Sequence, residues 1–522
     1  MRNKNSETTL VGAALALQAD RRIATPREER KHRGQFFTPS SVANFMASLP
    51  SLSGATIDIL DPGAGLGILS AAVSERVLGF ESPRKLHFEL YETDPTLLQA
   101  LDGCMESCGR ALRAAGHEMS FCIHEQDFIL ALAPQTRLFD RQVDARRFDL
   151  AIMNPPYYKL SKDSPHARAM REVIHGQPNI YALFMALAAD LLRQGGELVA
   201  ITPRIFCNGP YFRGFRRRYF EHMSLERVHL FESRTDTFRE SSVLQESVIT
   251  YSIRTHQSPM VRLSTSGRSN LFDASESVLR SGLVLDDSGG DNILRIPETS
   301  VDASIMTHLE AWPFRFTDLG LRVSTGPVVS FRAKPFLRQA LDGVDTVPLL
   351  SVHNVRAFEV LWPVTKGMKP TALKVTVDSA PLLVPAKNYV PMRRFTAKEE
   401  RRRLVAGAFL SEFAIRPLVA LENHLNFVYH ESRDLTTDET RGLTALFNSA
   451  LLDRYFRTIS GNTQVNAAEI RSMPLPSLET IARIGHRTFG LQLAEIENIE
   501  AVILEELGVS ESLQLDLAGA TR

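Results

Sequence analysis

Short apolar runs alternate with longer amphipathic stretches between Ile57 and Ile253. The runs that predict strands are Ile57–Leu60, Leu86–Tyr91, Phe121–Ile123, Leu150–Met153, Leu198–Thr202, Arg227–Phe231 and Val248–Ile253. Since strands that alternate with helices form βαβ units, this pattern predicts a mostly parallel sheet with helices on both faces. The first half of the chain is therefore predicted to be an α/β domain.

The pattern changes after this region. Residues 264–291 are rich in Ser, Gly and Asp, which indicates a connecting segment. Beyond them, short strands mix with loops, and helices are predicted around Glu399–Phe413, Thr436–Thr458 and, with amphipathic spacing, Ile481–Leu507. The predicted organisation is an α/β domain with an N-terminal helical segment over residues 1–262, a linker over 263–295, a mixed α+β domain over 296–480, and a C-terminal packing helix and tail over 481–522.

The composition is that of a folded protein with more than one domain. The chain has 522 residues, of which 44% are hydrophobic and 23% charged, and this length exceeds one ordinary domain. No apolar run approaches the roughly 20 residues of a membrane-spanning helix. Met1–Glu7 lacks the apolar core of a signal peptide. We therefore expect a cytoplasmic protein with no membrane partner.

Charge and cysteine content add little. The 60 Lys and Arg residues equal the 60 Asp and Glu residues, so the bulk charge gives no sign of a nucleic-acid partner. Any such affinity has to come from local clusters of arginine. The four cysteines are too few for a disulfide framework. Cys104 and Cys108 have no second Cys/His pair at metal-ligand spacing, so no metal site is expected.

A glycine-rich turn follows the first predicted strand. The segment Asp61–Gly67 (DPGAGLG) leads from that strand into a predicted helix. Glycines let the backbone approach a ligand and adopt positive φ, and the start of a helix supplies unpaired amides. Such a turn is common to all dinucleotide-binding folds, so alone it indicates only a nucleotide-like ligand.

Two acidic residues at the ends of the next strands extend this prediction. Glu92 follows the strand Leu86–Tyr91, where a carboxylate can bind both hydroxyls of a ribose. Asp127 follows the third strand, where it could accept a hydrogen bond from an adenine amino group. Each could equally be a solvated charge at a strand end. Together with the turn they predict a nucleoside site, without separating a dinucleotide from S-adenosylmethionine.

The segment Asn154-Pro155-Pro156-Tyr157 follows the fourth predicted strand. It therefore lies at the carboxyl edge of the sheet, where open α/β folds bind ligands. The prolines fix φ and lack N–H donors, so the Asn154 side-chain oxygen and the Pro155 carbonyl are predicted to be rigid acceptors. An exocyclic amine could donate both N–H bonds to them and direct its lone pair at an incoming methyl group, with Tyr157 facing the ring. The alternative is a rigid turn without a chemical role.

With these residues the chain resembles the amino-methyltransferases of bacterial restriction–modification systems in the gamma order of motifs, and is similar to the TaqI adenine-N6 enzyme. Residues 179–184 (NIYALF) and 195–204 (GGELVAITPR) look closer to the BsuBI/PstI branch. The resemblance covers residues 30–255 well and the C-terminal half only loosely. It implies a Rossmann-like, S-adenosylmethionine-dependent methyltransferase domain and a DNA target-recognition domain over residues 296–480.

The resemblance also implies roles for matching positions. Gly34–Pro39 resembles the segment that covers the methionine part of the cofactor. The implied cofactor-binding residues are Phe37, Thr38, Asp61, Gly63, Gly65, Glu92, Asp127 and Asn154. The implied catalytic residues are Asn154, Pro155, Pro156 and Tyr157. Phe238 aligns with the aromatic residue that stacks on the target base, although it could instead be a core phenylalanine before the strand Val248–Ile253.

The implied reaction is direct methyl transfer to N6 of an adenine in duplex DNA. Because the duplex buries that amino group, the base has to be flipped into the pocket, where Tyr157 and Phe238 would sandwich it. Catalysis would come from orientation and approach, with no covalent intermediate and no metal. The expected partners are double-stranded DNA and a separate cognate restriction endonuclease.

Sequence-specific recognition requires contacts with base edges, which are expected from the C-terminal half. The predicted DNA-binding residues are Arg213, Arg216, Arg393, Arg394, Arg401 and Arg402. A run of arginines on a helix is as often a solvated face, so a structural role competes with this assignment.

Three other functions fit part of the pattern. Protein methyltransferases that act on glutamine amides also use Asn-Pro-Pro-Tyr, but they are much shorter and lack the Gly34–Pro39 segment. An RNA methyltransferase is a second alternative. A non-catalytic DNA-binding subunit is a third, and the intact Asp61–Gly67 and Asn154–Tyr157 segments argue against it.

Overall fold

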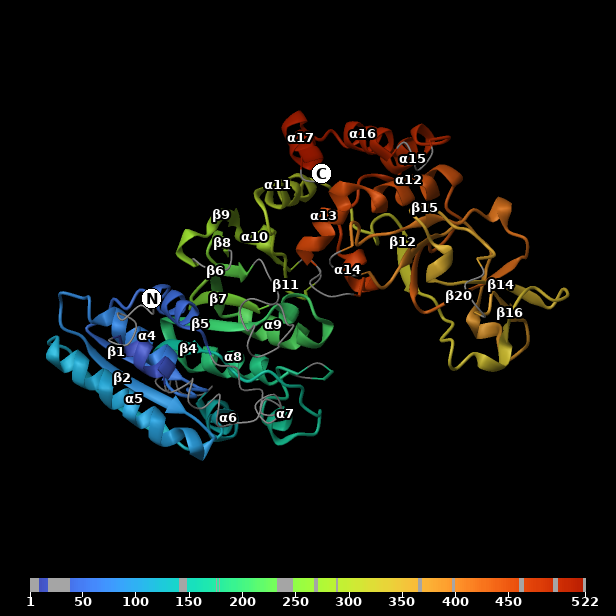
Figure 1. Cartoon of the computed structure of the whole chain (residues 1–522). Coiled ribbons are helices and arrows are strands. Elements are labelled where there is room, and N and C mark those ends of the chain that lie inside the picture. The colour runs from blue at the N-terminus through green and yellow to red at the C-terminus, as the bar shows by residue number, and fades with distance from the viewer. Residues whose placement is uncertain are drawn as a thin grey trace, which may run out of the picture. The chain divides into compact units, whose positions relative to one another are not determined.

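The computed structural model describes residues 9–16, 38–139, 148–174, 176–177, 179–231, 247–266, 271–287, 290–364, 369–396, 400–459, 464–491 and 496–519. The chain divides into two compact units, Met1–Ile296 (unit 1) and Pro297–Arg522 (unit 2), which are coloured along the chain in Figure 1. Within these ranges no helix is both long enough and apolar enough to cross a membrane.

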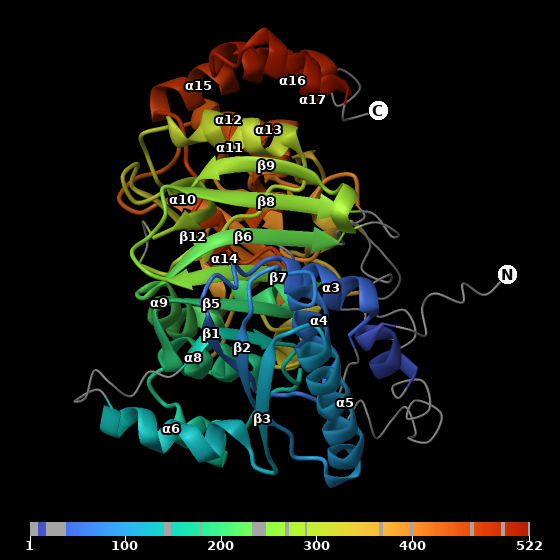
Figure 2. The same cartoon turned by 90° about the vertical axis from the view of Figure 1, so that its left-hand side faces the viewer.

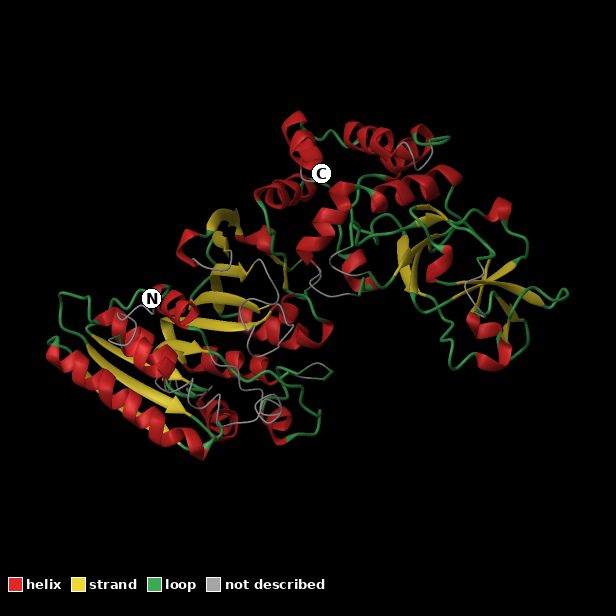
Figure 3. Cartoon of the chain, viewed as in Figure 1, coloured by secondary structure: helices red, strands yellow, loops and turns green. Residues whose placement is uncertain are grey.

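Unit 1 is built on a large mixed sheet, drawn in yellow in Figure 3. The strands that the described residues contribute to it are β1 (Thr56–Asp61), β2 (Lys85–Tyr91), β3 (Glu118–His124), β4 (Phe148–Met153), β5 (Leu192–Pro203), β6 (Met223–Phe231), β7 (Ser247–Arg254), β8 (Met260–Ser266) and β9 (Ser275–Arg280). Their order is β3-β2-β1-β4-β5-β7-β6-β8-β9. The first five pair in parallel, and β7 runs antiparallel to β5 and β6. The prediction of a mostly parallel α/β sheet is confirmed.

Helices cover both faces of this sheet (Figure 2). One face packs on α3 (Ser40–Ser48), α4 (Ile68–Val77) and α5 (Pro95–Ala114), and the other on α6 (Phe128–Phe139), α8 (Ile180–Leu191) and α9 (Arg213–Phe220). In β4, Leu150 and Ile152 belong to the first core, and Ala151 and Met153 to the second. A strand buried on both faces needs apolar residues at every position, which explains the continuous apolar runs of the sequence.

The strand order reverses between β1 and β4. The chain leaves β1 toward β2 and β3, then returns to the other side of β1 at β4. Open α/β sheets bind ligands in the crevice at such a point, outside the carboxyl ends of the strands. The loops that leave β1 and β4 are the two predicted motifs, and a Cβ placed on Gly63 would lie 4.0 Å from the carbonyl oxygen of Asn154. The topology therefore brings the glycine turn and the Asn154 loop side by side at the carboxyl edge of the sheet.

The predicted linker over residues 263–295 is wrong. Strand β8 pairs in parallel with β6 and antiparallel with β9, so this segment extends the sheet. It continues through α10 (Ser281–Val284) and the pair β10 (Leu285–Asp286) and β11 (Ile293–Leu294). Strand β9 lies at the edge, and its side chains are all at least partly exposed. An edge strand of this kind tolerates Ser and Glu, and for that reason its sequence resembles a loop.

Unit 2 is a mixed α+β unit. One of its sheets has the strand order β12 (Leu321–Thr325), β21 (Leu425–His430), β18 (Val390–Arg393). Another has the order β13 (Leu337–Arg338), β16 (Ala372–Lys374), β14 (Thr346–Leu350), β20 (Leu418–Leu421), β17 (Leu383–Pro385). In addition, β15 (Phe358–Glu359) pairs with β19 (Gly407–Ala408). Its helices include α11 (Ser300–Glu310), α12 (Thr437–Asn448), α13 (Ala450–Ile459), α14 (Ala467–Arg471), α15 (Leu478–Arg487), α16 (Ile496–Glu506) and α17 (Glu511–Gly519).

Local sequence explains where several helices begin. Asp94 caps α5 by accepting the Thr96 amide at 3.0 Å, and Pro95 occupies the first helical position. Thr436 and Glu439 form a capping box at the start of α12. The helix predicted at Thr436–Thr458 is confirmed as α12 and α13, which are separated at Ser449.

Candidate active site

The glycine turn combines a packed position with an open one. Gly65 and Gly67 have backbone φ angles of 57° and 77°, values that residues with a Cβ rarely adopt. A Cβ on Gly67 would also lie 2.9 Å from Leu101 Cδ1 of α5, whereas one on Gly65 would meet no atom within 4 Å. Helix packing therefore requires the glycine at position 67, and Gly65 borders open space that a ligand can enter.

Asp61 places a carboxylate with an unpartnered oxygen beneath this turn. Its side chain is buried, and Oδ2 accepts a hydrogen bond of 2.8 Å from Ser70 Oγ. Within the described part of the chain, Oδ1 is buried without a hydrogen-bond partner. Burial raises the pKa of Asp61 to about 7, and the nearby charge of Glu92 adds to the rise. A buried acceptor without a donor is costly, so this oxygen fits a donor group or a positive charge on a ligand.

Glu92 lies at the carboxyl end of β2 and is tied to the same turn. Its Oε2 accepts the Gly65 amide at 2.9 Å, and Oε1 accepts the amides of Thr93 and Asp94 at 2.9 and 2.8 Å. Burial raises the pKa of Glu92 in spite of these bonds. A carboxylate has about four acceptor sites. Backbone amides occupy three of these sites, so the carboxylate keeps about one acceptor site for a ligand.

Asp127 lies before α6 and contacts a residue that the sequence analysis missed. Its Oδ1 accepts the Leu130 amide at 2.9 Å, and its Oδ2 lies 2.8 Å from Nε2 of His166. Because a carboxylate only accepts, the proton of this bond belongs to His166. His166 stands in α7 (Pro165–Ala169), well away from Asp127 in sequence, and no spacing rule would have connected the two.

The Asn154 side chain is held on both sides. Its Nδ2 donates to Oγ1 of the buried Thr38 at 3.0 Å, and the Tyr157 hydroxyl lies 2.7 Å from its Oδ1. The same hydroxyl lies 2.8 Å from the carbonyl oxygen of Ile201 in β5. One hydroxyl has a single hydrogen to donate, so Asn154 and Ile201 are alternative acceptors for it. These contacts fix the orientation of the amide in the crevice.

Sequence analysis predicted that the ring of Tyr157 faces the target base, but in the structure this ring is largely buried. Its side chain is only 8% exposed, and burial raises its pKa. It contacts Tyr181 of α8 edge-on, with ring centroids 6.0 Å apart. Its hydroxyl orients Asn154, a role without any sequence signal, because the second acceptor comes from another strand. Stacking of Tyr157 on a target base stays a prediction.

Two predicted site residues, Phe37 and Phe238, lie outside the described residues. The prediction that Arg216 binds DNA is wrong. Its side chain is 1% exposed and donates to the carbonyl oxygens of Phe206, Gly209 and Asp291 at 2.8 to 3.0 Å, so it anchors loops of unit 1. Arg213 is half-exposed and forms an ion pair with Asp291.

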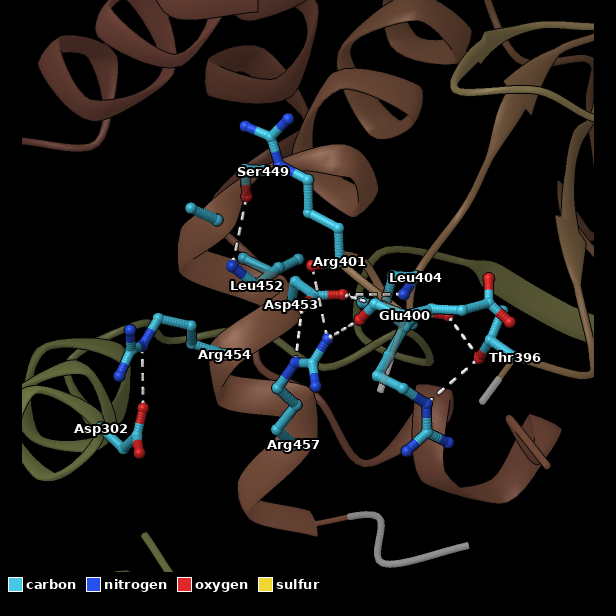
Figure 4. A network of polar contacts seen from close by, with 12 residues as sticks. Asp302, Thr396, Glu400, Arg401, Leu404, Ser449, Leu452, Asp453, Arg454 and Arg457 are labelled. Carbon is cyan, nitrogen blue, oxygen red and sulfur yellow. Dashed lines mark hydrogen bonds and ion pairs between the residues drawn. The ribbon is translucent and has the colours of Figure 1, made fainter. Parts of the chain in front are cut away.

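The helix predicted around the arginine run, Glu399–Phe413, is also wrong. Figure 4 shows Asp453 of α13 facing this segment, where its Oδ1 accepts the amides of Arg403 and Leu404 at 2.5 and 2.8 Å. The described residues then enter β19 and a short turn at Ser411–Phe413. The helix propensity of these residues does not decide the conformation here, because a buried acid on another helix accepts hydrogen bonds from their backbone amides.

The arginines of unit 2 therefore differ from one another. Arg401 is exposed, and Arg402 lies 3.8 Å from Glu500 with both side chains mostly covered. Arg393 donates to the Val355 carbonyl at 2.9 Å. Arg394 donates to the Asn423 carbonyl at 3.0 Å, and its guanidinium lies 5.7 Å from the ring centre of the exposed Phe395. The ion pair favours a structural role for Arg402, and DNA binding by the others stays a prediction.

The sheet order, with the glycine turn and the Asn154 loop side by side at one sheet edge, places unit 1 in the class of Rossmann-like methyltransferases. The model of the Eco57I restriction-modification methylase family matches residues 114–238. The type II methyltransferase M.PstI of Providencia stuartii is 33% identical over 492 residues, which is 93% of this chain and 94% of that protein. M.BsuBI of Bacillus subtilis, also a type II methyltransferase, is 36% identical over 488 residues, covering 91% and 92%. The chain belongs to this family of type II methyltransferases.

Among solved structures, the type IIG restriction endonuclease BpuSI matches 92% of this chain and 67% of its own, with 13% identity and a TM-score of 0.43. The family assignment rests on the two sequence relatives.

The raised pKa of Asp61 predicts a pH-dependent stability of unit 1. Between pH 3.8 and about 7 the unfolded chain loses a proton that folded Asp61 keeps, so the free energy of unfolding falls as pH rises. Asp61→Asn removes this loss, which amounts to about 1.4 kcal/mol for each unit of pKa difference. Hydrogen exchange of β1 and α4 should be slower in the variant than in the wild type at pH 8. The difference should shrink toward pH 3.8.

The matched control is Asp102→Asn, which changes an exposed acid on α5. It should track the wild type at every pH. An Asp61→Asn variant with the same pH dependence as the wild type would show that Asp61 is ionised in the folded protein.

Proposed function

We propose that this protein transfers a methyl group from S-adenosylmethionine to N6 of an adenine flipped out of duplex DNA, as the modification enzyme of a type II restriction–modification system. The observation that carries the proposal is the Asn154 side chain, held by Thr38 and Tyr157 beside the glycine turn at the strand-order reversal. The relatives named type II methyltransferases and the restriction-modification methylase model support it.

The residues around the crevice fit the proposed cofactor, which would supply the methyl group on a positively charged sulfur. The unpartnered Oδ1 of buried Asp61 suits a donor or a cation, Glu92 suits the ribose hydroxyls, and Asp127 suits the adenine amino group. The open space next to Gly65 leaves room for a ligand beside the backbone.

In the proposed reaction, Asn154 Oδ1 and the Pro155 carbonyl accept the two N–H bonds of the target amine. This aims the nitrogen lone pair at the methyl group, and transfer is a direct displacement helped by orientation. Thr38 keeps the Asn154 amide from rotating. When the amine takes the place at Oδ1, the Tyr157 hydroxyl keeps Ile201 as its acceptor, so this hydroxyl stays hydrogen-bonded.

The test is tritiated methyl transfer from S-adenosylmethionine to unmethylated genomic DNA, with tRNA and a release factor as parallel substrates. The expected result is label in DNA, recovered as N6-methyladenine after digestion. Label only in RNA or protein would overturn the substrate assignment, and label in DNA as methylcytosine would overturn the adenine assignment. No transfer to any substrate would favour a non-catalytic subunit.

Arg394 offers a test of the proposed DNA contact in unit 2. Since its guanidinium lies beside exposed Phe395, we expect Arg394→Ala to weaken DNA binding and to reduce the salt dependence of the affinity by about one phosphate contact. Fluorescence anisotropy at several salt concentrations measures both quantities.

Arg441 provides the matched control, because its guanidinium lies 4.2 Å from the ring centre of exposed Phe489. Asp438 lies one helical turn before Arg441 on α12, so Arg441→Ala should leave DNA affinity unchanged. An equal loss of DNA affinity in Arg394→Ala and Arg441→Ala would mean that Arg394 makes no specific contact with DNA.

A further inference from the structure

The contact between Asp127 and His166 joins two parts of unit 1 that the proposed reaction uses separately. Asp127 is the acid assigned to the adenine of the cofactor, and His166 belongs to the segment after the Asn154–Tyr157 loop. Their side chains are 27% and 18% exposed, and Asp127 Oδ2 lies 2.8 Å from His166 Nε2. The other oxygen accepts the Leu130 amide. Both carboxylate oxygens thus have a protein donor, and the Ile129 amide also hydrogen-bonds this side chain.

The helix α7, which carries His166, is anchored to the core of unit 1. Ser164 caps α7 by accepting the Ala167 amide at 3.2 Å. The side chains of Ala167 and Met170 are buried, and Met170 belongs to the core shared with α6 and α8. At the far end of the segment, the Ile180 amide donates to the Tyr158 carbonyl at 3.1 Å. The imidazole is therefore presented to Asp127 by a helix that is fixed to the core.

We propose that His166 is a positioning residue for the cofactor: it orients the Asp127 carboxylate toward the adenine amino group and thereby links cofactor binding to the segment that follows the catalytic loop. The inference rests on the proposed function, because it assumes that Asp127 faces the adenine. A carboxylate held only by the neighbouring amides at the start of α6 has no donor fixing the oxygen that faces His166. The bond from His166 removes this freedom and leaves the carboxylate with a further acceptor site.

The protonation state of Asp127 determines which base of a bound nucleoside it can hydrogen-bond. Burial raises the pKa of Asp127, but the hydrogen bonds from His166 and the Leu130 amide outweigh this effect, so the pKa lies below its ordinary value. The carboxylate is then an acceptor at neutral pH. It favours a base that donates an amino hydrogen at this position, and disfavours a base with a carbonyl oxygen there.

The experiment compares two ligands and three variants. Calorimetry measures the dissociation constants of S-adenosylhomocysteine and of its inosine counterpart, in which a carbonyl replaces the amino group. The wild type should prefer the adenosine compound. His166→Ala should weaken its binding on the order of tenfold, the size of one hydrogen bond to a charged group, and should leave the inosine compound unchanged. His166→Gln, which keeps a donor, should restore most of the affinity. The control His87→Ala removes a histidine of β2 that hydrogen-bonds Ser120 of β3, and it should match the wild type.

The outcomes separate this inference from the proposed function. Equal weakening of both ligands in His166→Ala would show a structural role and overturn the inference while the cofactor assignment stands. The same holds if His166→Ala binds like the wild type. A wild type that binds both ligands equally would show that Asp127 does not contact the amino group, and one that binds neither would overturn the cofactor assignment itself.

Discussion

Asn154→Ala is expected to lower the single-turnover rate of methyl transfer on the order of a thousandfold or more, while the variant still binds the cofactor. The amide oxygen of Asn154 is the acceptor that would orient the target amine, and alanine has no group to replace it. Thr38 and the Tyr157 hydroxyl bond this side chain, but neither depends on it for folding of the sheet. Quenched-flow transfer to DNA and calorimetry with S-adenosylhomocysteine measure the two quantities.

Gln99→Ala is the matched control, because it removes an exposed amide from α5. It should transfer methyl groups at the wild-type rate. Tyr157→Phe should fall between the two variants, since it keeps the ring but no longer orients Asn154. A normal rate in Asn154→Ala would show that the amide is not the acceptor and would reduce the segment to a rigid turn.

Gly442→Ala is expected to destabilise unit 2 severely while unit 1 still binds cofactor. Gly442 of α12 and Gly485 of α15 lie where the two helices approach most closely. A Cβ on Gly442 would lie 1.8 Å from the carbonyl oxygen of Ile481, and one on Gly485 would lie 1.9 Å from that of Asp438. Alanine favours a helix over glycine by about 1 kcal/mol, but overlap with backbone forces the helices apart and costs about 3 kcal/mol or more.

Both tryptophans of the chain, Trp312 and Trp362, belong to unit 2. Urea unfolding followed by their fluorescence therefore measures the destabilisation. Gly103→Ala is the control, because a Cβ at this helical position of α5 would meet no atom within 4 Å. Since it lies in unit 1, it should leave the fluorescence transition of unit 2 unchanged. An unchanged unfolding midpoint in Gly442→Ala would mean that α12 and α15 can separate at little cost.

The α/β half of the protein was accessible to sequence analysis for a simple reason. Strands such as Leu150–Met153 are buried on both faces, so they read as continuous apolar runs, and the loops that follow them fall at one edge of a parallel sheet. This pattern predicts that the Asn154–Tyr157 segment lies at the carboxyl edge of the sheet, and the Asp61–Gly67 turn also follows a predicted strand. The structure brings Gly63 and Asn154 together there.

The errors have equally specific causes. Strand β9 is rich in polar residues because it is an edge strand, and it was mistaken for part of a linker. Arginines carry no sign of whether they face solvent, so buried Arg216 was grouped with exposed Arg401. The segment at Arg403 has the composition of a helix, but Asp453, fifty positions along the chain, holds it in another conformation.

Sequence alone determined the class of fold, the order of the strands along the chain and the loops that carry polar side chains. Hydrophobic periodicity and turn residues are signals that span only a few neighbouring positions, so they can be recognised without the tertiary structure. What tertiary structure decided was the set of partners of each polar group. The Tyr157 hydroxyl meets Ile201 and Asp127 meets His166 through contacts between different elements, and among the described residues no donor reaches Oδ1 of Asp61. A hydrogen bond depends on position within a fraction of an ångström, and only the packed sheet and helices set positions that closely.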